Sequence, residues 1–297
     1  MHFTSRRDFL RFSLGAGAAL AASASLPCPQ VGAAPSTATG MRLGLVTYQW
    51  GNDWDLPTLI ANCQKTGLKG VELRTQHAHH VEPDLSPAQR KEVKKRFADS
   101  PITLVGLGTN QDFHHSDPAK LRKSIELAKA FVKLGHDVGG SGVKVKPNDL
   151  PKGVPEDKTT EQIGRALNEL GAFAADYGQQ IRLEIHGGCS RIPVIRKIIA
   201  VATHPNVFLC WNSNQTDLEA PGLEANFNAL KSRFGATTHV RPLDTPKYPW
   251  GELIKLFVRM DYRGWILLEA GTKVNDRIKA IIAQRKLFET MVAAAKA

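Results

Sequence analysis

Short apolar runs alternate with longer amphipathic stretches eight times along this chain, and this alternation limits the fold more than any other feature. Each run has the length of a single strand and is followed by a loop and a helical pattern, with no hairpin signal between runs. Such strands pair in parallel and are covered on both faces. The pattern predicts one (β/α)8 TIM barrel over residues 41–297. An open, doubly wound sheet is the alternative, but no G-x-G-x-x-G sequence follows the first strand.

The expected elements follow one another closely, so no second domain is expected. Ser86-Pro87 illustrates the boundaries, since a serine N-cap precedes a proline in the first helical turn. About 260 residues lie beyond the N-terminal segment, a usual size for one such barrel. Strands are expected over 42–48, 70–74, 103–108, 143–146, 181–184, 207–212, 237–239 and 265–269. Helices are expected over 56–65, 86–98, 118–134, 160–177, 192–202, 223–234, 250–260 and 274–295.

The first 34 residues are typical of an export signal. Ser5-Arg-Arg-Asp-Phe-Leu-Arg11 matches the twin-arginine signal, and an apolar stretch of small residues follows over 12–26. That stretch is shorter than the roughly 20 apolar residues that cross a bilayer. We therefore expect a cleavable twin-arginine signal peptide over residues 1–34 and export to the periplasm or another extracytoplasmic compartment. No later segment has the character of a transmembrane helix.

The chain is basic, which bears on its class of partner. The formal net charge is +11, and it is +9 without the three arginines and one aspartate of residues 1–34. A basic surface attracts anions. However, the lysines and arginines are spread along helical patterns, as in Arg90-Lys-Glu-Val-Lys-Lys-Arg96, so no nucleic-acid partner is expected. The cysteines beyond the signal, Cys63, Cys189 and Cys210, match no zinc spacing and are expected to be buried thiols.

Four of the apolar runs end in a metal-type ligand or its amide analogue. These residues are Glu184, Asn212, His239 and Glu269. The carboxyl ends of barrel strands converge on one face, so the four side chains are expected to meet there. Two carboxylates and an imidazole indicate a divalent metal and acid–base chemistry. A structural salt bridge is the alternative for each glutamate, and a buried core histidine for His239. Asn212 carries no charge and is a weak metal ligand.

Other polar residues near the strand ends are candidates for substrate binding. Residues two apart on a strand share a face, so His186 is expected to accompany Glu184, and Arg241 to accompany His239. A guanidinium at that place holds a carboxylate, a phosphate or a polarised carbonyl. The full set of candidates is His186, Arg241, Lys144, Glu72 and Asn214. Among them, Lys144 is suited to neutralising a carboxylate or stabilising an enolate, and Asn214 to orienting a sugar or water.

Five histidines lie in the loops expected after the second and third strands. They are His77, His79, His80, His114 and His115. Their spacing fits no known ligand pattern, and the adjacent pair His114-His115 is expected to point apart. Substrate contacts or plain surface histidines are therefore expected rather than a second metal site.

The ordered motifs at the strand ends resemble those of the xylose isomerase-like barrel superfamily, and within it the sugar phosphate isomerase/epimerase branch. The likeness covers nearly all of the chain from Met41 onward. It is carried by Gly70-Val-Glu-Leu73, Leu183-Glu-Ile-His-Gly187, Thr238-His-Val-Arg-Pro-Leu-Asp244 and Leu268-Glu269.

This resemblance implies a ligand set and a reaction. Glu184, His239 and Glu269 would be three of four ligands to a divalent metal such as Mn²⁺, Mg²⁺, Co²⁺ or Zn²⁺. The fourth ligand of the family, normally an aspartate, aligns with Asn212. In the ketose epimerases of this superfamily, two glutamates exchange protons with the substrate carbon on opposite faces. The metal meanwhile stabilises a cis-enediolate.

The leading hypothesis is thus a metal-assisted isomerase, epimerase or related lyase acting on a small-molecule sugar or polyol. Glu184 and Glu269 would be its acid–base pair. A metal-poor periplasmic sugar-binding protein of the same fold is the alternative that Asn212 favours. A phosphodiesterase, like the DNA-repair endonuclease of the same superfamily, is disfavoured by Asn212 and by the exported destination. A homo-oligomeric assembly is compatible with all three.

Overall fold

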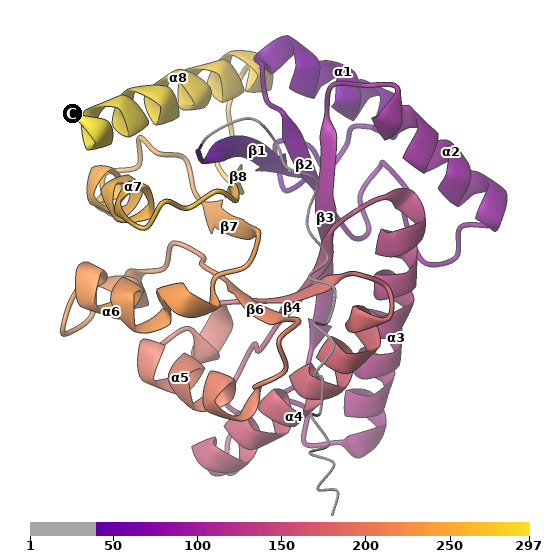
Figure 1. Ribbon diagram of the computed structural model, residues 1–297, viewed down its shortest axis with the longest axis vertical. Coiled ribbons are helices and arrows are strands. Elements are labelled where there is room, and N and C mark those ends of the chain that lie inside the picture. The colour runs from indigo at the N-terminus through magenta and orange to yellow at the C-terminus, as the bar shows by residue number, and fades with distance from the viewer. Residues whose placement is uncertain (1–39) are drawn as a thin grey trace, which may run out of the picture. The chain divides into compact units, whose positions relative to one another are not determined.

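The computed structural model describes residues 40–297 (Figure 1), so the predicted signal peptide lies outside the described residues. The strands are β1 (Arg42–Val46), β2 (Gly70–Arg74), β3 (Thr103–Asp112), β4 (Gly142–Lys146), β5 (Gln180–Glu184), β6 (Val207–Cys210), β7 (Thr237–Val240) and β8 (Trp265–Leu268). The helices are α1 (Leu56–Thr66), α2 (Pro87–Ala98), α3 (Pro118–Val138), α4 (Glu156–Ala175), α5 (Ile192–Val201), α6 (Leu223–Leu230), α7 (Trp250–Arg259) and α8 (Arg277–Lys296).

All eight strands are parallel and form one sheet in the order β6-β5-β4-β3-β2-β1-β8-β7. The two end strands meet through isolated bridges, of which Asn212 with His239 is one. The backbone N–H of His239 donates to the carbonyl of Trp211 across this seam, at 2.7 Å. The predicted (β/α)8 TIM barrel is therefore confirmed, and its nearly closed seam brings two of the predicted site residues side by side.

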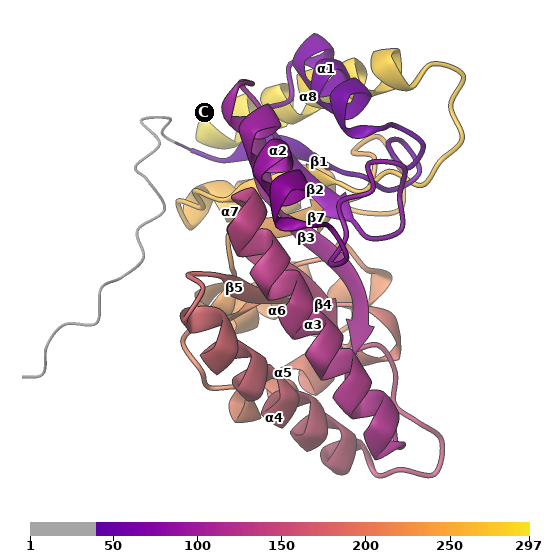
Figure 2. The ribbon, with the colours of Figure 1, turned by 90° about the vertical axis from the view of Figure 1, so that its right-hand side faces the viewer.

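The helices surround the strands, and α3 lies alongside β3 (Figure 2). Several helices begin where the sequence places a cap. At the start of α2, the Ser86 side chain accepts a hydrogen bond from the backbone N–H of Gln89. The Gln89 side chain accepts one from the backbone N–H of Ser86, so both of these N–H groups have a partner. The helix α1 ends at Gly67, whose φ of 77° lies in the left-handed region that glycine adopts readily. None of the helices in residues 40–297 is long and apolar enough to cross a membrane.

Several boundaries differ from the sequence expectation. The strands β1 and β6 end two residues early, at Val46 and Cys210, while α3 continues to Val138, α6 ends at Leu230 and α8 begins at Arg277. The differences at β3 and α4 concern charged residues. The strand β3 does not end at residue 108. A register shift after Gly108 lets Asp112 pair with Lys146 of β4, so Asp112 belongs to the strand and not to the following loop. The helix α4 begins at Glu156 rather than at residue 160, and the carboxylates of Glu156 and Asp157 lie in its first turn, where the helix dipole favours negative charge.

Side chains alternate between the two faces of each strand and form layers inside the barrel. Inside the barrel the guanidinium of Arg182 donates to the Val105 carbonyl at 3.2 Å and to Ser141 Oγ at 2.7 Å. Trp265 packs with Val46, Val105 and Leu267 in a small apolar cluster. Two positions beyond Gly70, Gly142, Arg182 and Thr237, the strands carry the buried polar side chains of Glu72, Lys144, Glu184 and His239. This polar layer, below the carboxyl ends of the strands, is where the site lies.

Candidate active site

Glu184, His239 and Glu269 meet at the carboxyl end of the barrel, and each comes from a different strand or its end. One donor atom from each lies within 4.8 Å of the others. His239 Nδ1 is 3.5 Å from Glu184 Oε1 and 3.9 Å from Glu269 Oε2. The structure thus brings together the three charged-type residues of the predicted metal set.

His239 lies between carboxylates on both sides. Its Nε2 is 3.2 Å from Glu72 Oε1, close enough for an ion pair. Among residues 40–297, neither ring nitrogen of His239 nor either oxygen of Glu72 has a well-aligned hydrogen-bond partner. Burial disfavours the imidazolium, but Cys210, Glu72 and Glu184 outweigh it and raise the pKa of His239 well above its usual value. Burial likewise opposes the ionised form of Glu72, yet His239 and Lys144 lower its pKa.

Both oxygens of Glu184 have donors from the chain itself. Lys144 Nζ donates to Oε2 at 2.7 Å, and Asn212 Nδ2 donates to Oε1 at 3.0 Å. The side chains of Lys144 and Glu184 are each only 2% exposed. Burial alone would raise the pKa of Glu184, but Lys144 and His239 hold it well below its usual value.

Glu269 has the opposite environment. Its side chain is 18% exposed, and burial together with the negative charge of Glu184 raises its pKa. Neighbouring carboxyls with pKa values pushed apart are suited to opposite roles in proton transfer. Glu184 is the ionised member of this pair, and Glu269 is the one that holds a proton more readily.

The residues present fit a divalent cation. Two carboxylates and an imidazole suit Zn²⁺ and Mn²⁺, and the buried Nδ1 of His239 has no hydrogen-bond partner among the described residues. Glu72 lies behind the opposite ring nitrogen, as the carboxylate behind a metal-binding histidine does. Asn212 turns its amide nitrogen to Glu184, so its oxygen is its only atom able to bind a cation.

A cavity of about 650 Å³ opens over this cluster, and Glu269 and Asn212 reach it. Of the predicted substrate-binding residues, His186, Asn214 and Arg241 line the cavity. Lys144 and Glu72 do not line it. They lie buried beneath, with Lys144 against Glu184 and Glu72 against His239.

Tyr48 and Arg74 also line the cavity but are absent from the set expected from the sequence. The Arg74 guanidinium packs over the Tyr48 ring at 4.8 Å from its centroid and donates to Asn110 Oδ1 at 3.3 Å. Both residues lie at or just beyond the ends of β1 and β2. They would have been found by considering the polar residues at the carboxyl ends of all eight strands, since these ends surround the active site of a barrel.

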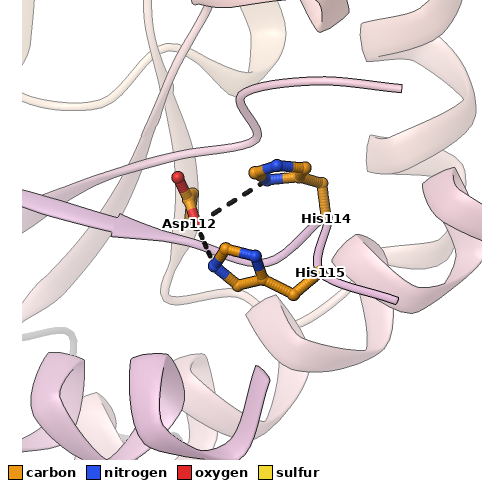
Figure 3. A group of neighbouring side chains, drawn as sticks. All are labelled: Asp112, His114 and His115. Atoms are coloured by element: carbon orange, nitrogen blue, oxygen red, sulfur yellow. Dashed lines mark ion pairs between the residues drawn. The ribbon is translucent and has the colours of Figure 1, made fainter. Parts of the chain in front are cut away.

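Among the loop histidines, His79 differs from the adjacent pair His114 and His115. His79 is structural, because its Nε2 contacts the Arg74 carbonyl at 2.8 Å and its Nδ1 accepts from Val81 N at 3.0 Å, and burial lowers its pKa to about 4. His114 and His115 were expected to point apart. Figure 3 shows instead that both rings turn toward Asp112, because the β3 extension places that carboxylate between them.

The fold has clear relatives. Residues 60–290 match the family described as the xylose isomerase-like TIM barrel. A search of curated proteins finds no match. Among solved structures, a 3-keto-D-glucoside 4-epimerase from E. coli is similar at 13% identity and a TM-score of 0.72, covering 84% of this chain and 99% of that chain. An L-ribulose 3-epimerase is similar at 15% identity and 0.73, covering 86% and 96%. The IolI protein with a zinc atom is similar at 16% identity and 0.73, covering 86% and 99%.

Proposed function

The chain belongs to the xylose isomerase-like TIM barrel family, and from that premise we propose that it is a divalent-metal-assisted isomerase or epimerase of a sugar or polyol. The observation that carries the proposal is the approach of Glu184, His239 and Glu269 to within 4.8 Å, beneath a cavity of substrate size. Neighbours in fold are named as sugar epimerases, and one holds a zinc atom, which supports the same class of activity.

The cation would be held by Glu184 Oε1, His239 Nδ1 and a Glu269 oxygen, with the Asn212 amide oxygen as a fourth donor. When bound, it would supply positive charge that polarises a substrate carbonyl and stabilises an enediolate. Glu72 would fix the ring of His239 from behind. Lys144 engages the remaining oxygen of Glu184, so this carboxylate offers one oxygen to a cation and not two.

Proton transfer is assigned to the two glutamates. Glu269 reaches the cavity and has a raised pKa, so it serves as the proton donor. Glu184 is held ionised by Lys144 and serves as the acceptor on the opposite side of the reacting carbon. His186, Asn214 and Arg241 line the cavity walls, where they would orient hydroxyl and carbonyl groups of the substrate.

Solvent proton exchange tests this mechanism directly. The metal-loaded protein is incubated in D₂O with a panel of ketoses and 3-keto-glucosides, and loss of the carbon-bound proton is followed by NMR. We expect exchange with a responsive sugar, and its loss in both Glu184→Gln and Glu269→Gln. Glu252→Gln, an exposed carboxylate on α7, is the matched control and should exchange like the wild type. Unchanged exchange in both site variants would rule out the mechanism.

A metal-independent sugar-binding protein is the second candidate. It is favoured by the hydrogen bonds that Lys144 and Asn212 donate to the two oxygens of Glu184, since they stabilise the ionised carboxylate without a cation. Calorimetry with the same sugars, in the presence and absence of chelator, separates the two functions. Binding that is unaffected by chelator, with no proton exchange, would support this candidate over the enzyme.

Export is proposed on the twin-arginine sequence alone. Cell fractionation of the full chain should place it outside the cytoplasm, and replacement of both Arg6 and Arg7 by lysine should retain it inside. Equal distribution of the two forms would remove the basis for this proposal.

A further inference from the structure

We propose that Asp112, His114 and His115 form a second binding site for a transition-metal cation such as Zn²⁺, separate from the cluster at His239. The proposal stands whether or not the reaction proposed above is correct. All three residues lie at the end of β3 or directly after it, and none of them lines the cavity described above.

The distances between the donor atoms are close to those of a bound cation. Asp112 Oδ1 is 2.7 Å from His115 Nε2 and 3.6 Å from His114 Nδ1 (Figure 3), and all three donor atoms lie within 4.8 Å of one another. Ligand atoms about 2.1 Å from a zinc ion are separated by roughly 3.0–3.4 Å. Small rotations of the side chains therefore suffice to admit the ion. One carboxylate with two imidazoles is a donor set used by zinc and by non-haem iron.

The backbone between the donors holds the two imidazoles on the same side. Phe113, between Asp112 and His114, is fully buried in the core. The side chain of Gln162 on α4 donates to the carbonyls of Phe113 at 2.7 Å and His115 at 3.0 Å. This turn is therefore fixed by packing and by hydrogen bonds, and the two adjacent histidines converge because of it.

His114 supplies a second, independent observation. Its Nδ1 is buried and has no hydrogen-bond partner among residues 40–297, although it is turned toward Asp112 Oδ1. A buried nitrogen without a partner costs free energy. A plain ion pair between Asp112 and His115 would leave this cost in place, whereas a cation at the centre of the three donors would use the lone pair of His114.

The carboxylate is also oriented from behind, as ligating carboxylates are. Asn148 Nδ2 donates to Asp112 Oδ2 at 2.8 Å, which leaves Oδ1 for the histidines. Asn148 has a φ of 63°, in the left-handed region that asparagine tolerates, and its carbonyl accepts from Cys189 N at 2.9 Å. Its Oδ1 lies 3.1 Å from Nδ1 of His186, a residue of the cavity. A cation at Asp112 would therefore brace the loops that position His186.

Metal content after removal of bound metal and reloading with Zn²⁺ tests the site. The wild type should hold one zinc per chain more than His114→Ala and one more than His115→Ala, as counted by mass spectrometry. His80→Asn is the matched control, since His80 is an exposed loop histidine with a φ of 52° that asparagine tolerates, and it should bind as much as the wild type. Equal zinc content in the wild type and both alanine variants would overturn the proposal.

A measurement on the unmodified chain covers the case in which the variants do not fold. In histidine ¹⁵N NMR spectra, addition of Zn²⁺ to the metal-free protein should shift Nδ1 of His114 and Nε2 of His115, the two atoms turned to Asp112, while both nitrogens of His80 stay unchanged. Unshifted resonances of His114 and His115 at saturating Zn²⁺ would overturn the proposal without any substitution.

Discussion

Replacement of Lys144 by methionine should destabilise the protein strongly, because Lys144 is one half of a buried ion pair. Its Nζ lies 2.7 Å from Glu184 Oε2, and both side chains are only 2% exposed. Methionine keeps most of the length of the side chain and removes the charge. The substitution leaves the Glu184 carboxylate buried, with Asn212 as a hydrogen-bond donor to Oε1 and His239 Nδ1 3.5 Å from the same oxygen.

The magnitude follows from the distance and the burial. Two unit charges 2.7 Å apart attract by about 6 kcal/mol at an effective dielectric constant of about 20. The desolvation of both ions offsets much of this in the intact pair. Breaking a buried pair by removing one partner costs about 3–5 kcal/mol, because the other charge stays buried. The imidazole of His239 offsets part of this cost for Glu184, so the low end of the range applies. We therefore expect Lys144→Met to lower the free energy of unfolding by about 3 kcal/mol or more at pH 7.

The assay is urea unfolding with chelator present, so that no bound cation contributes. Lys197→Met is the matched control, since Lys197 pairs with Glu156 and Asp157 at the surface and is 47% exposed. Exposed pairs contribute about 0–1 kcal/mol. If Lys144→Met lowered the free energy of unfolding no more than Lys197→Met does, the Lys144–Glu184 pair would not be a desolvated ion pair.

The pH dependence of the difference in unfolding free energy between the wild type and Lys144→Met provides an independent test of the ion pair. The pKa of Glu184 is lowered in the folded state, so its contribution is present above its unfolded pKa and is lost as the pH falls through the folded pKa. Once Glu184 is protonated and neutral, its burial no longer requires the positive charge of Lys144. The destabilisation by Lys144→Met should therefore be largest near neutral pH and shrink on acidification.

Three further predictions concern single carboxylates and Asn212. Glu269→Gln should slow sugar proton exchange by about 100-fold or more, measured by NMR against Glu252→Gln. Asp217→Asn should gain stability over the wild type as the pH rises from about 4 to 7, because burial raises the folded pKa of Asp217 from 3.8 to about 7 and its contribution is lost over that interval. The gain is at most about 4 kcal/mol, and unfolding curves that stay parallel across this range would contradict it. Asn212→Asp should be destabilised in chelator by repulsion from Glu184, 3.0 Å away, yet gain more in Tm on addition of Mn²⁺ than the wild type; an equal gain would contradict it.

The strand–helix order could be predicted from the sequence because the signals for it are local. Apolar runs, proline after a cap and glycine at a helix end each act within a few residues. Once the barrel is assigned, the convergence of Glu184, His239 and Glu269 follows from topology, since strand ends of a barrel share one face. This part of the site needs no knowledge of side-chain packing.

The partners of those residues could not be predicted in the same way. Lys144 contacts Glu184, and Glu72 contacts His239, because of how far neighbouring strands are shifted along one another. The pairing register sets this shift, and the periodicity of the sequence does not reveal it. The convergence of His114 and His115 depends on a register shift after Gly108 and on the burial of Phe113. Such irregularities arise from contacts between elements, so spacing alone suggested the opposite orientation.

The charges around His239 give a physical reason for an asparagine at position 212. Glu72, Glu184 and Glu269 bring three carboxylates to one place. Lys144 pairs with Glu184, and the imidazole of His239 lies within 3.9 Å of all three. A fourth carboxylate would face Glu184 at close range and would be tolerated only with a cation in place. The Asn212 amide donates to Glu184 instead, so the cluster stays satisfied without a cation. We infer that Lys144 and Asn212, which stabilise the ionised Glu184 in the metal-free protein, also lower the affinity of Glu184 for a cation. The affinity for metal and the stability of the metal-free protein therefore depend on the same carboxylate.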